Sequence, residues 1–347
     1  MKRLIIAYPL AIFLSIIGSK AFAHDIAVEN ADGVTIYYAY INDGKELSVT
    51  SSPDLYSRYS NNVVIPEDVI YNNITRKVTR INDYAFYGCG DLSSVTSPPS
   101  ITYIGYSSFL ECNNLKEIRI SDLAAWCKIN FHDYPLNYSH HLFLNNTEIH
   151  DLVIPNSVTS ISRSAFYGCS SLKSVIIPNS VTEIEESVFR SCDSLTSVTI
   201  PNSINSIKAS TFWDCINLSS ITIPNSVTTI GNSAFSGCSR LTSIIIPNSI
   251  VNIGKNAFLG CGDSAVSAVF ISDLEAWCNI CFSNRWANPL SGAHHLFLND
   301  TEIKDLVIPN SITNIENNTF SGCRGLTSIT IPQNVVGIGE CAFYGCI

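Results

Sequence analysis

The sequence has little charge, and after its first residues it has no long apolar run. Only 14% of the 347 residues are Asp, Glu, Lys or Arg, whereas 46% are hydrophobic. This composition excludes an intrinsically disordered chain, which combines high charge with little apolar content. No later stretch reaches the roughly 20 apolar residues that cross a bilayer, so we expect no transmembrane segment.

Basic residues are also scarce. Twenty Lys and Arg stand against 29 Asp and Glu, which gives a net charge of −9 at pH 7. An acidic surface repels phosphate backbones, so the charge argues against nucleic acid as a partner.

The motifs of common catalytic and metal sites are missing from the sequence. It contains no His-Glu-x-x-His, no Gly-x-Ser-x-Gly and no pair of Cys-x-x-Cys motifs. Cys278 and Cys281 follow Trp277 with the spacing of a redox dithiol, but a related stretch after Trp126 has Asn130 in place of the second cysteine. A structural role for these cysteines is therefore favoured over a redox enzyme.

Two pairs of adjacent histidines could suggest a metal site. They are His140-His141 and His294-His295. Adjacent residues in a strand point to opposite faces, so neither pair is suited to chelating one ion. We expect no catalysis, no metal and no cofactor.

The N-terminus has the pattern of an export signal. Lys2 and Arg3 precede an apolar stretch, 4–17, and Ala21-Phe22-Ala23 offers small residues before a cleavage point. We interpret residues 1–23 as a signal peptide and the protein as exported, either extracellular or at a cell surface.

What the sequence does contain is a period of 23 residues. It is carried by Pro155, Pro178, Pro201, Pro224 and Pro247, by Phe166, Phe189, Phe212, Phe235 and Phe258, and by Cys169, Cys192, Cys215, Cys238 and Cys261. It resumes at Pro309 and Pro332 and also runs earlier, through Phe86 and Phe109. A fixed period of 20–30 residues with Leu-x-x-Val-x-Ile spacing is typical of a leucine-rich-repeat solenoid.

A single unit cannot bury its own apolar residues, so successive coils must stack. Within the unit that starts at Leu172, we expect Val175 and Ile177 to point inward and the strand to end at Pro178, which has no N–H for a ladder. The repeated Phe should form a stack on the opposite wall. The repeated Cys should form a ladder of reduced, buried thiols that donate to backbone carbonyls.

The unit Leu-x-x-Val-x-Ile-Pro-Asn-Ser-Val-x-x-Ile-x-x-x-Ala-Phe-x-x-Cys resembles the BspA-like (Treponema pallidum type) leucine-rich repeats, over roughly residues 72–347. The resemblance implies an exported or surface-attached protein of the kind implicated in adhesion to host matrix proteins, to other bacteria and to epithelium. It brings no catalytic residue with it.

Two insertions are near copies of each other. Ile-Ser-Asp-Leu-x-Ala-Trp-Cys begins at Ile120 and at Ile271, and His-His-Leu-Phe-Leu-Asn follows at His140 and His294. We name residues 120–151 the first island and residues 271–305 the second island. Each is expected to form a short helix, with Ser272 and Glu275 as a capping box in the second, then a loop and a β-hairpin that turns at Asn145-Asn146 or Asn299-Asp300.

The predicted fold class is an α/β-type repeat solenoid, a leucine-rich-repeat arc of about eleven 23-residue coils with a parallel sheet on one face and the two island coils. Residues 24–70 are expected to form an N-terminal β-rich cap, with a hairpin turn at Asn42-Asp43-Gly44, and residues 71–347 the solenoid. The last coil stops before its strand, which indicates either a truncated chain or an open end that another molecule covers.

The predicted ligand-binding residues lie on the solvent side of the parallel sheet. They are Ser174, Ile176, Ser197, Thr199, Ser220, Thr222, Ser243, Ile245 and Phe270. A flat, charge-poor surface with exposed aliphatic and aromatic groups is typical of a contact site, although Thr and Ile are also good strand formers. The predicted function is binding of host matrix or cell-surface proteins or glycans, or of other microbial cells. The alternative is a structural surface module that assembles through its open end.

Overall fold

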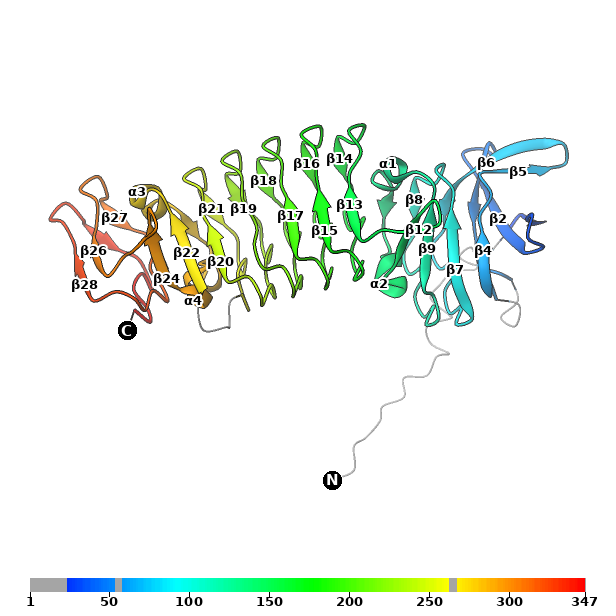
Figure 1. Ribbon diagram of the computed structural model, residues 1–347. Helices are drawn as coiled ribbons and strands as arrows, with labels where there is room; N and C mark the ends of the chain where they lie inside the picture. The colour runs from blue at the N-terminus through cyan, green and yellow to red at the C-terminus, as the bar shows by residue number, and fades with distance from the viewer. Residues whose placement is uncertain (1–23, 54–57, 262–266, 347) are drawn as a thin grey trace, which may run out of the picture.

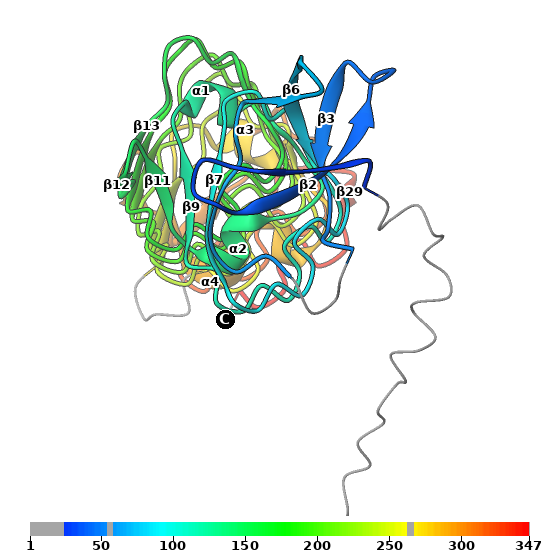
Figure 2. The same ribbon diagram turned by 90° about the vertical axis from the view of Figure 1, so that its right-hand side faces the viewer.

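The computed structural model describes residues 24–53, 58–261 and 267–346; the predicted signal peptide lies outside them. The chain forms a solenoid of about eleven turns that stack along one axis (Figure 1). Viewed from the N-terminal end, the coils superpose on one another, so they are stacked in register (Figure 2). The predicted repeat solenoid is therefore confirmed.

One long face of the solenoid carries the strand that ends each Leu-x-x-Val-x-Ile segment. We call the solvent side of these strands the strand face. They are β4 (Asn61–Val64), β7 (Leu92–Ser97), β9 (Glu117–Ile120), β11 (Leu142–Leu144), β13 (Asp151–Val153), β15 (Ser174–Ile176), β17 (Ser197–Thr199), β20 (Ser243–Ile245), β22 (Ser267–Ile271), β24 (His294–Leu298), β26 (Asp305–Val307) and β28 (Ser328–Thr330). The pairing between strands of successive coils is parallel, as in β13–β15–β17.

Shorter strands form a second wall, and most of them follow a Pro-Asn-Ser turn. They are β8 (Tyr103–Ile104), β10 (Asn130–Phe131), β14 (Ser160–Ile161), β16 (Glu183–Ile184), β18 (Ser206–Ile207), β19 (Thr229–Ile230), β21 (Asn252–Ile253), β23 (Cys281–Phe282), β27 (Asn314–Ile315) and β29 (Gly337–Ile338). They too pair in parallel, and each ends in a buried apolar residue in all but the last coil.

The core between the two walls holds the residues that the period predicts. Leu172, Val175, Ile177 and Phe189 are each at most 3% exposed. Burying an aliphatic or aromatic side chain of this size contributes about 1.5–3 kcal/mol. Because these residues recur in the regular coils, stacked neighbours bury apolar side chains that a single coil would leave exposed to water.

The repeated Phe residues form the expected stack. From Phe166 to Phe258 the ring centroids of successive coils lie 5.4–5.8 Å apart, and the rings are within 10° of parallel. Each Phe N–H also donates to a carbonyl of the next coil, as from Phe189 to Thr211. Phe86 and Phe109 form a separate stacked pair in the N-terminal coils, and Tyr59 packs on the ring of Phe86 at its end.

The repeated Cys residues form a ladder of thiol donors, as predicted. Cys112, Cys192, Cys215 and Cys238 each donate to the carbonyl of the Phe one coil earlier, at 3.0–3.2 Å. The residue before each Cys has a positive φ, which explains why Gly is frequent there (Gly168, φ +80°). A second positive-φ position lies two residues before each Phe and is mostly Ser or Asn.

The N-terminal region joins the solenoid through its sheet. β1 (Ile26–Glu29), β2 (Thr35–Ile41) and β3 (Glu46–Val49) are antiparallel, with Asn42 and Asp43 at positive φ in the expected turn. β3 then pairs in parallel with β6 (Ile74–Ile81). β5 (Asp68–Tyr71) and the first half of β6 form a hairpin that projects from this end (Figure 1).

Parallel pairing begins earlier than the predicted boundary at residue 71. β4 pairs with β7 and so already belongs to the sheet of the strand face. The sequence period does not reach residues 61–64, so this coil cannot be found from the repeat alone.

Helices occur within the two islands and are short. The first island contains α1 (Leu123–Trp126), α2 (Pro135–Ser139) and the hairpin strand β12 (Thr147–Glu148). The second contains α3 (Leu274–Cys278), a 3₁₀ turn (Arg285–Ala287), α4 (Leu290–Ala293) and β25 (Thr301–Glu302). The predicted helix, loop and hairpin are confirmed, and both hairpins turn on two residues of positive φ.

The predicted capping box at Ser272 and Glu275 is wrong. The N-cap of α3 is Asp273, whose carboxylate accepts from the N–H groups of Glu275 and Ala276. Asp122 caps α1 in the same way. Aspartate is as good an N-cap as serine, and Ser272 instead donates to Asn248 from the preceding coil.

Candidate binding surface

Two columns of outward side chains run along the strand face. Strand register aligns Ser174 with Ser197, Ile176 with Thr199, and Thr199 with Thr222. Farther along, it aligns Ser243 with Ala268 and Ile245 with Phe270. The predicted binding residues therefore lie on one face and in two rows, which is the arrangement that the repeat predicts.

The exposure of the aliphatic row is high. Ile176 and Ile245 are 51% and 57% exposed, and Val153 and Val307 in the same row are 59% and 60% exposed. Phe270 differs from our expectation, since it is only half-exposed. The ring of Phe297 stacks on it, with 5.0 Å between ring centroids.

Phe297 and its counterpart Phe143 belong to the same row but are absent from the predicted site. They enter it because β24 and β11 of the islands continue the parallel sheet next to β22 and β9. The repeated His-His-Leu-Phe-Leu segment could have predicted this position. Its inward and outward residues alternate as in the Ser-x-Ile strands of the regular coils.

The strand face is interrupted at each island. β12 pairs antiparallel with β11, and β25 pairs antiparallel with β24. Neither hairpin strand is joined to the strand that follows it, so β13 and β26 each begin a new sheet. A further break lies between β17 and β20, where only the isolated bridge of Thr199 and Thr222 continues the pairing.

At the first island the strand face carries a closed network of charges. The Arg119 guanidinium forms an ion pair with Glu117 at 2.5 Å and donates to Asn146 at 2.9 Å. It also lies over the ring of Phe143, 5.0 Å from the centroid. The polar and aromatic groups here are already partnered within the chain.

The second island has an apolar surface at the same positions. Ala268 and Phe270 take the places of Glu117 and Arg119, and the Phe270–Phe297 pair replaces the ion pair. A groove of about 430 Å³ opens next to Leu298, the residue after Phe297, at the break between β25 and β26. Its lining is Leu274, Leu298, Thr301, Glu302, Ile303, Lys304, Asp305 and Val307.

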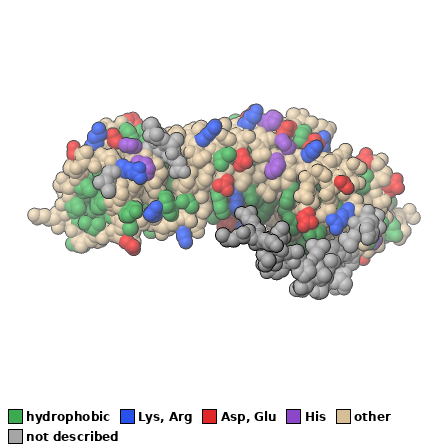
Figure 3. All heavy atoms as spheres, turned by 90° about the horizontal axis from the view of Figure 1, so that it is seen from below, with side chains coloured by type: hydrophobic (Ala, Val, Ile, Leu, Met, Phe, Trp, Pro, Cys, Tyr) green, Lys and Arg blue, Asp and Glu red, His purple; other side chains and the backbone are tan. Residues whose placement is uncertain are grey.

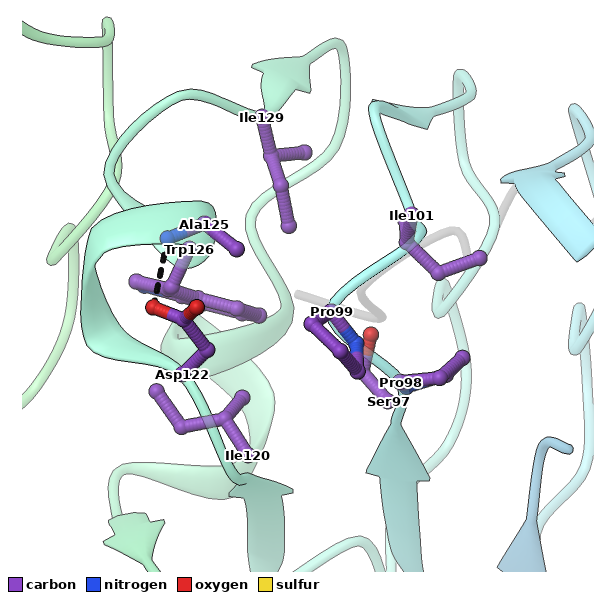
Figure 4. A pocket seen from close by; sticks show the side chains of 9 residues that line it. All are labelled: Ser97, Pro98, Pro99, Ile101, Ile120, Asp122, Ala125, Trp126 and Ile129. Atoms are coloured by element: carbon purple, nitrogen blue, oxygen red, sulfur yellow. Dashed lines mark hydrogen bonds between the residues drawn. The ribbon is translucent and has the colours of Figure 1, made fainter. Parts of the chain in front are cut away.

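A second, much smaller cavity lies under α1 of the first island. It measures about 10 Å³, and its lining includes Pro98, Pro99, Ile101 and Trp126. Asp122 and Ala125 line it too, and the Asp122 carboxylate accepts a hydrogen bond from the Ala125 N–H (Figure 4). A volume of this size holds about one water molecule, so this cavity is not a ligand site.

The histidine pairs point apart, as predicted. In the first island His140 contacts the Gly168 carbonyl, whereas His141 faces Glu148 at 2.5 Å. Burial would raise the pKa of Glu148, but the hydrogen bond and charge of His141 outweigh it and lower this pKa. Within residues 24–53, 58–261 and 267–346, no group of three His, Cys, Asp or Glu side chains is placed to hold a metal ion.

The two cysteines with dithiol spacing lie in different environments. Cys278 is buried at the end of α3, and burial raises the pKa of its thiol to about 12. Cys281 is exposed on β23 of the second wall. A thiol that stays protonated at neutral pH is a poor nucleophile, so Cys278 lacks the activation that redox catalysis needs.

Comparison with known proteins agrees with this architecture. Six copies of the BspA type leucine rich repeat region match residues 67–134, 136–285 and 293–347. The chain belongs to the BspA-type leucine-rich-repeat family. Family membership accounts for the repeat and for a fold that is typically non-catalytic.

Solved structures of bacterial leucine-rich-repeat proteins are similar to this BspA-type chain. One from Bacteroides ovatus is 24% identical over 93% of this chain and 80% of that chain, with a TM-score of 0.57. A leucine rich cell surface protein from Faecalibacterium prausnitzii is 25% identical over 92% and 74% of the two chains, with a TM-score of 0.48. A leucine-rich-repeat protein of T. pallidum is 26% identical over 59% and 87%, with a TM-score of 0.39.

No curated protein matches the chain. Among the residues that the structure describes, no helix has the length and apolar character needed to cross a membrane.

Proposed function

We propose that this BspA-type protein is exported and binds other macromolecules through its strand face, without catalysis. The observation that supports this most is the row of exposed Val153, Ile176, Ile245 and Val307 on a flat sheet. Aliphatic side chains that are more than half exposed, aligned along one surface, are typical of an interaction site.

The chemistry around that row suits proteins or glycans. Its neighbouring column is rich in hydroxyls, with Ser174, Ser197, Ser220 and Ser243 in consecutive coils. Serine hydroxyls donate and accept, so they can bond main-chain amides or sugar hydroxyls at low cost in charge. Host matrix proteins, epithelial surfaces and other microbial cells are the partners we propose.

A binding assay with surface variants tests this function. Immobilised matrix proteins, mucin and epithelial cells would be probed with the wild-type chain and with Ile176→Glu/Ile245→Glu. We expect the double variant to bind at least tenfold more weakly, with unchanged urea unfolding, because two charges would be forced against the partner.

Val251→Glu is the matched control, because Val251 is also an exposed aliphatic residue but precedes β21 of the second wall. It should bind as the wild type does. Equal loss of binding in both variants, or no binding to any surface, would contradict the proposed function.

The assembly alternative rests on the last described coil. Ile331 and Ile338 are exposed there, whereas Ile177 and Ile184 at the same repeat positions are buried by the coil that follows. Figure 3 shows hydrophobic side chains over the C-terminal coils, at the left of the view. If these residues join chains end to end, light scattering should show growth with concentration that Ile331→Glu abolishes; a constant monomeric mass would refute assembly.

A further inference from the structure

The groove of the second island lies between two strand edges that face each other. β25 is the last strand of one sheet and β26 is the first strand of the next. The N–H of Ile303 donates to Leu296, so those two residues form the hydrogen-bonded pair of the hairpin. In an antiparallel ladder the next pair, Phe297 and Glu302, is then non-bonded, and the main-chain N–H and C=O of Glu302 point toward the groove.

The interior of the groove is apolar. Leu274, Leu298 and Ile303 are half-buried and pack on the core from three different segments, and Val307 of β26 forms the far side. Its volume of about 430 Å³ lies in the range of pockets that take a substantial ligand group. It has ample room for a bulky aliphatic or aromatic side chain.

The rim of the groove carries net negative charge. Glu302 and Asp305 supply two carboxylates. One oxygen of Glu302 contacts the His295 ring at 2.6 Å, and Lys304 supplies one ammonium that is mostly exposed and 3.9 Å from the other oxygen. Asp305 is fixed by hydrogen bonds from Thr327 and Ser328. A partner with a basic group is therefore favoured at this place, and the acidic chain as a whole adds to the attraction.

The first island shows which group fits beside such a phenylalanine. There the chain's own Arg119 lies over Phe143, in the register position that Phe270 holds beside Phe297. In the second island no side chain of the described residues supplies a guanidinium to Phe297, although Glu302 lies opposite it. Phe270 already stacks on Phe297 from the position of Arg119, so a guanidinium from a partner would approach Phe297 from the side of Glu302 and would gain this carboxylate as well.

We propose that this groove binds an extended polypeptide segment of a partner protein as an added strand beside β25. One apolar side chain of the segment enters the groove, and the next residue, an Arg or Lys, faces outward to Phe297 and Glu302. Neighbouring residues of a strand point to opposite faces, which sets this adjacent spacing. The inference rests on the proposed function and names its partner class.

Fluorescence polarisation with labelled octapeptides tests the inference on the full chain. The probe is fluorescein-Thr-Ser-Thr-Leu-Arg-Thr-Ser-Thr, compared with the same peptide carrying Ser for Leu or Glu for Arg. We expect saturable binding of the first peptide and at least a tenfold loss for each of the other two. No saturable binding, or equal binding of all three, would overturn the proposal.

Matched variants locate the site. Val307→Asp should weaken the Leu-Arg peptide at least tenfold and Glu302→Gln about threefold or more. Val251→Asp, the same change at a comparably exposed valine before β21 of the second wall, should leave binding unchanged. If Val251→Asp and Val307→Asp act alike, the peptide does not bind in this groove and the proposal is wrong.

Failure of this inference is distinguishable from failure of the proposed function. If Val307→Asp still binds matrix proteins or cells while Ile176→Glu/Ile245→Glu does not, the strand face binds but the groove is not the peptide site. If mucin glycans freed of protein compete for the surface and the peptides do not bind, the partner is a glycan and the peptide proposal falls.

Discussion

The two islands share a buried frame and differ on the surface. In both, an Asp caps a short helix, a tryptophan is buried and donates to a carbonyl of the following coil, and a hairpin closes the coil. Trp126 donates to Ala165 at 2.9 Å and Trp277 donates to Thr319 at 3.1 Å.

What differs is what faces solvent. Glu117 and Arg119 form an ion pair on one island, whereas the other has Ala268 and Phe270 at these positions and an open groove at its hairpin. The stacking of coils therefore sets the core residues of an island, while its outer residues can differ in charge and shape.

The largest effect should come from the tryptophans, and it should be equal in the two islands. Trp126→Ala and Trp277→Ala each remove a fully buried ring and should lower the free energy of unfolding by about 3–5 kcal/mol. Urea denaturation measures this. Trp213→Ala is the control, since that half-exposed ring lies on Arg190 and should cost clearly less. If substituting an island tryptophan by Ala lowered the unfolding free energy no more than Trp213→Ala does, the two islands would not share a common buried frame.

A smaller effect should separate the islands at a buried polar residue. Asp133 accepts from the N–H groups of Phe109 and Tyr134, taking the place of the next coil's carbonyl at the end of the Phe stack. Asp133→Ala should cost roughly 2–3 kcal/mol because it leaves buried donors unpaired. Asn284→Ala, at the half-buried counterpart in the second island, should cost about 1 kcal/mol. Equal unfolding midpoints for the two variants would contradict this difference.

The same residue predicts a pH dependence for the first island. Burial raises the pKa of Asp133 above its ordinary value of 3.8, although the hydrogen bonds from Phe109, Tyr134, Ser108 and Tyr138 oppose it. The folded state then holds this proton at a pH where the unfolded chain has released it. Stability from this group is complete below pH 3.8 and is lost as pH rises through the raised pKa.

Asp133→Asn removes this titration. The unfolding free energy of the wild type minus that of Asp133→Asn should therefore fall as pH rises from 3 to 7. A difference that increases with pH would show that the hydrogen bonds, and not burial, dominate at this carboxyl.

The smallest change in stability should accompany the sharpest change in binding. Ala268→Glu together with Phe270→Arg gives the second island the charged pair of the first. Exposed ion pairs and stacked aromatic pairs each contribute about 1 kcal/mol or less, so the unfolding free energy should change by no more than that. The new Arg would lie on Phe297 in place of Phe270, and its positive charge next to the peptide's Arg should weaken binding of the Leu-Arg peptide at least tenfold. Retained binding would argue that Phe297 is not part of the site.

Most of the fold follows from the period, because Pro178, Phe189 and Cys192 each have one place in a coil. The strand face could also be predicted from the period, because residues 23 positions apart align on neighbouring strands. The N-terminal coil could not, since β4 lacks the signature. The groove could not either, because it depends on the hairpin strand β25 failing to pair with β26, and that break appears in no spacing. Phe297 could have been found by aligning its segment with the regular strands.

The ladder of thiols has a chemical consequence for a protein that we propose to be exported. Burial raises the pKa of Cys112 and Cys169 to about 12, so at neutral pH neither presents the thiolate that peroxide or an alkylating agent attacks. Cys281 and Cys341, in contrast, are open to solvent on the outside of the solenoid. A maleimide dye should therefore label these two positions in the native protein and the interior thiols only in denaturant. The rate at which the interior thiols become labelled then measures how fast the coils open.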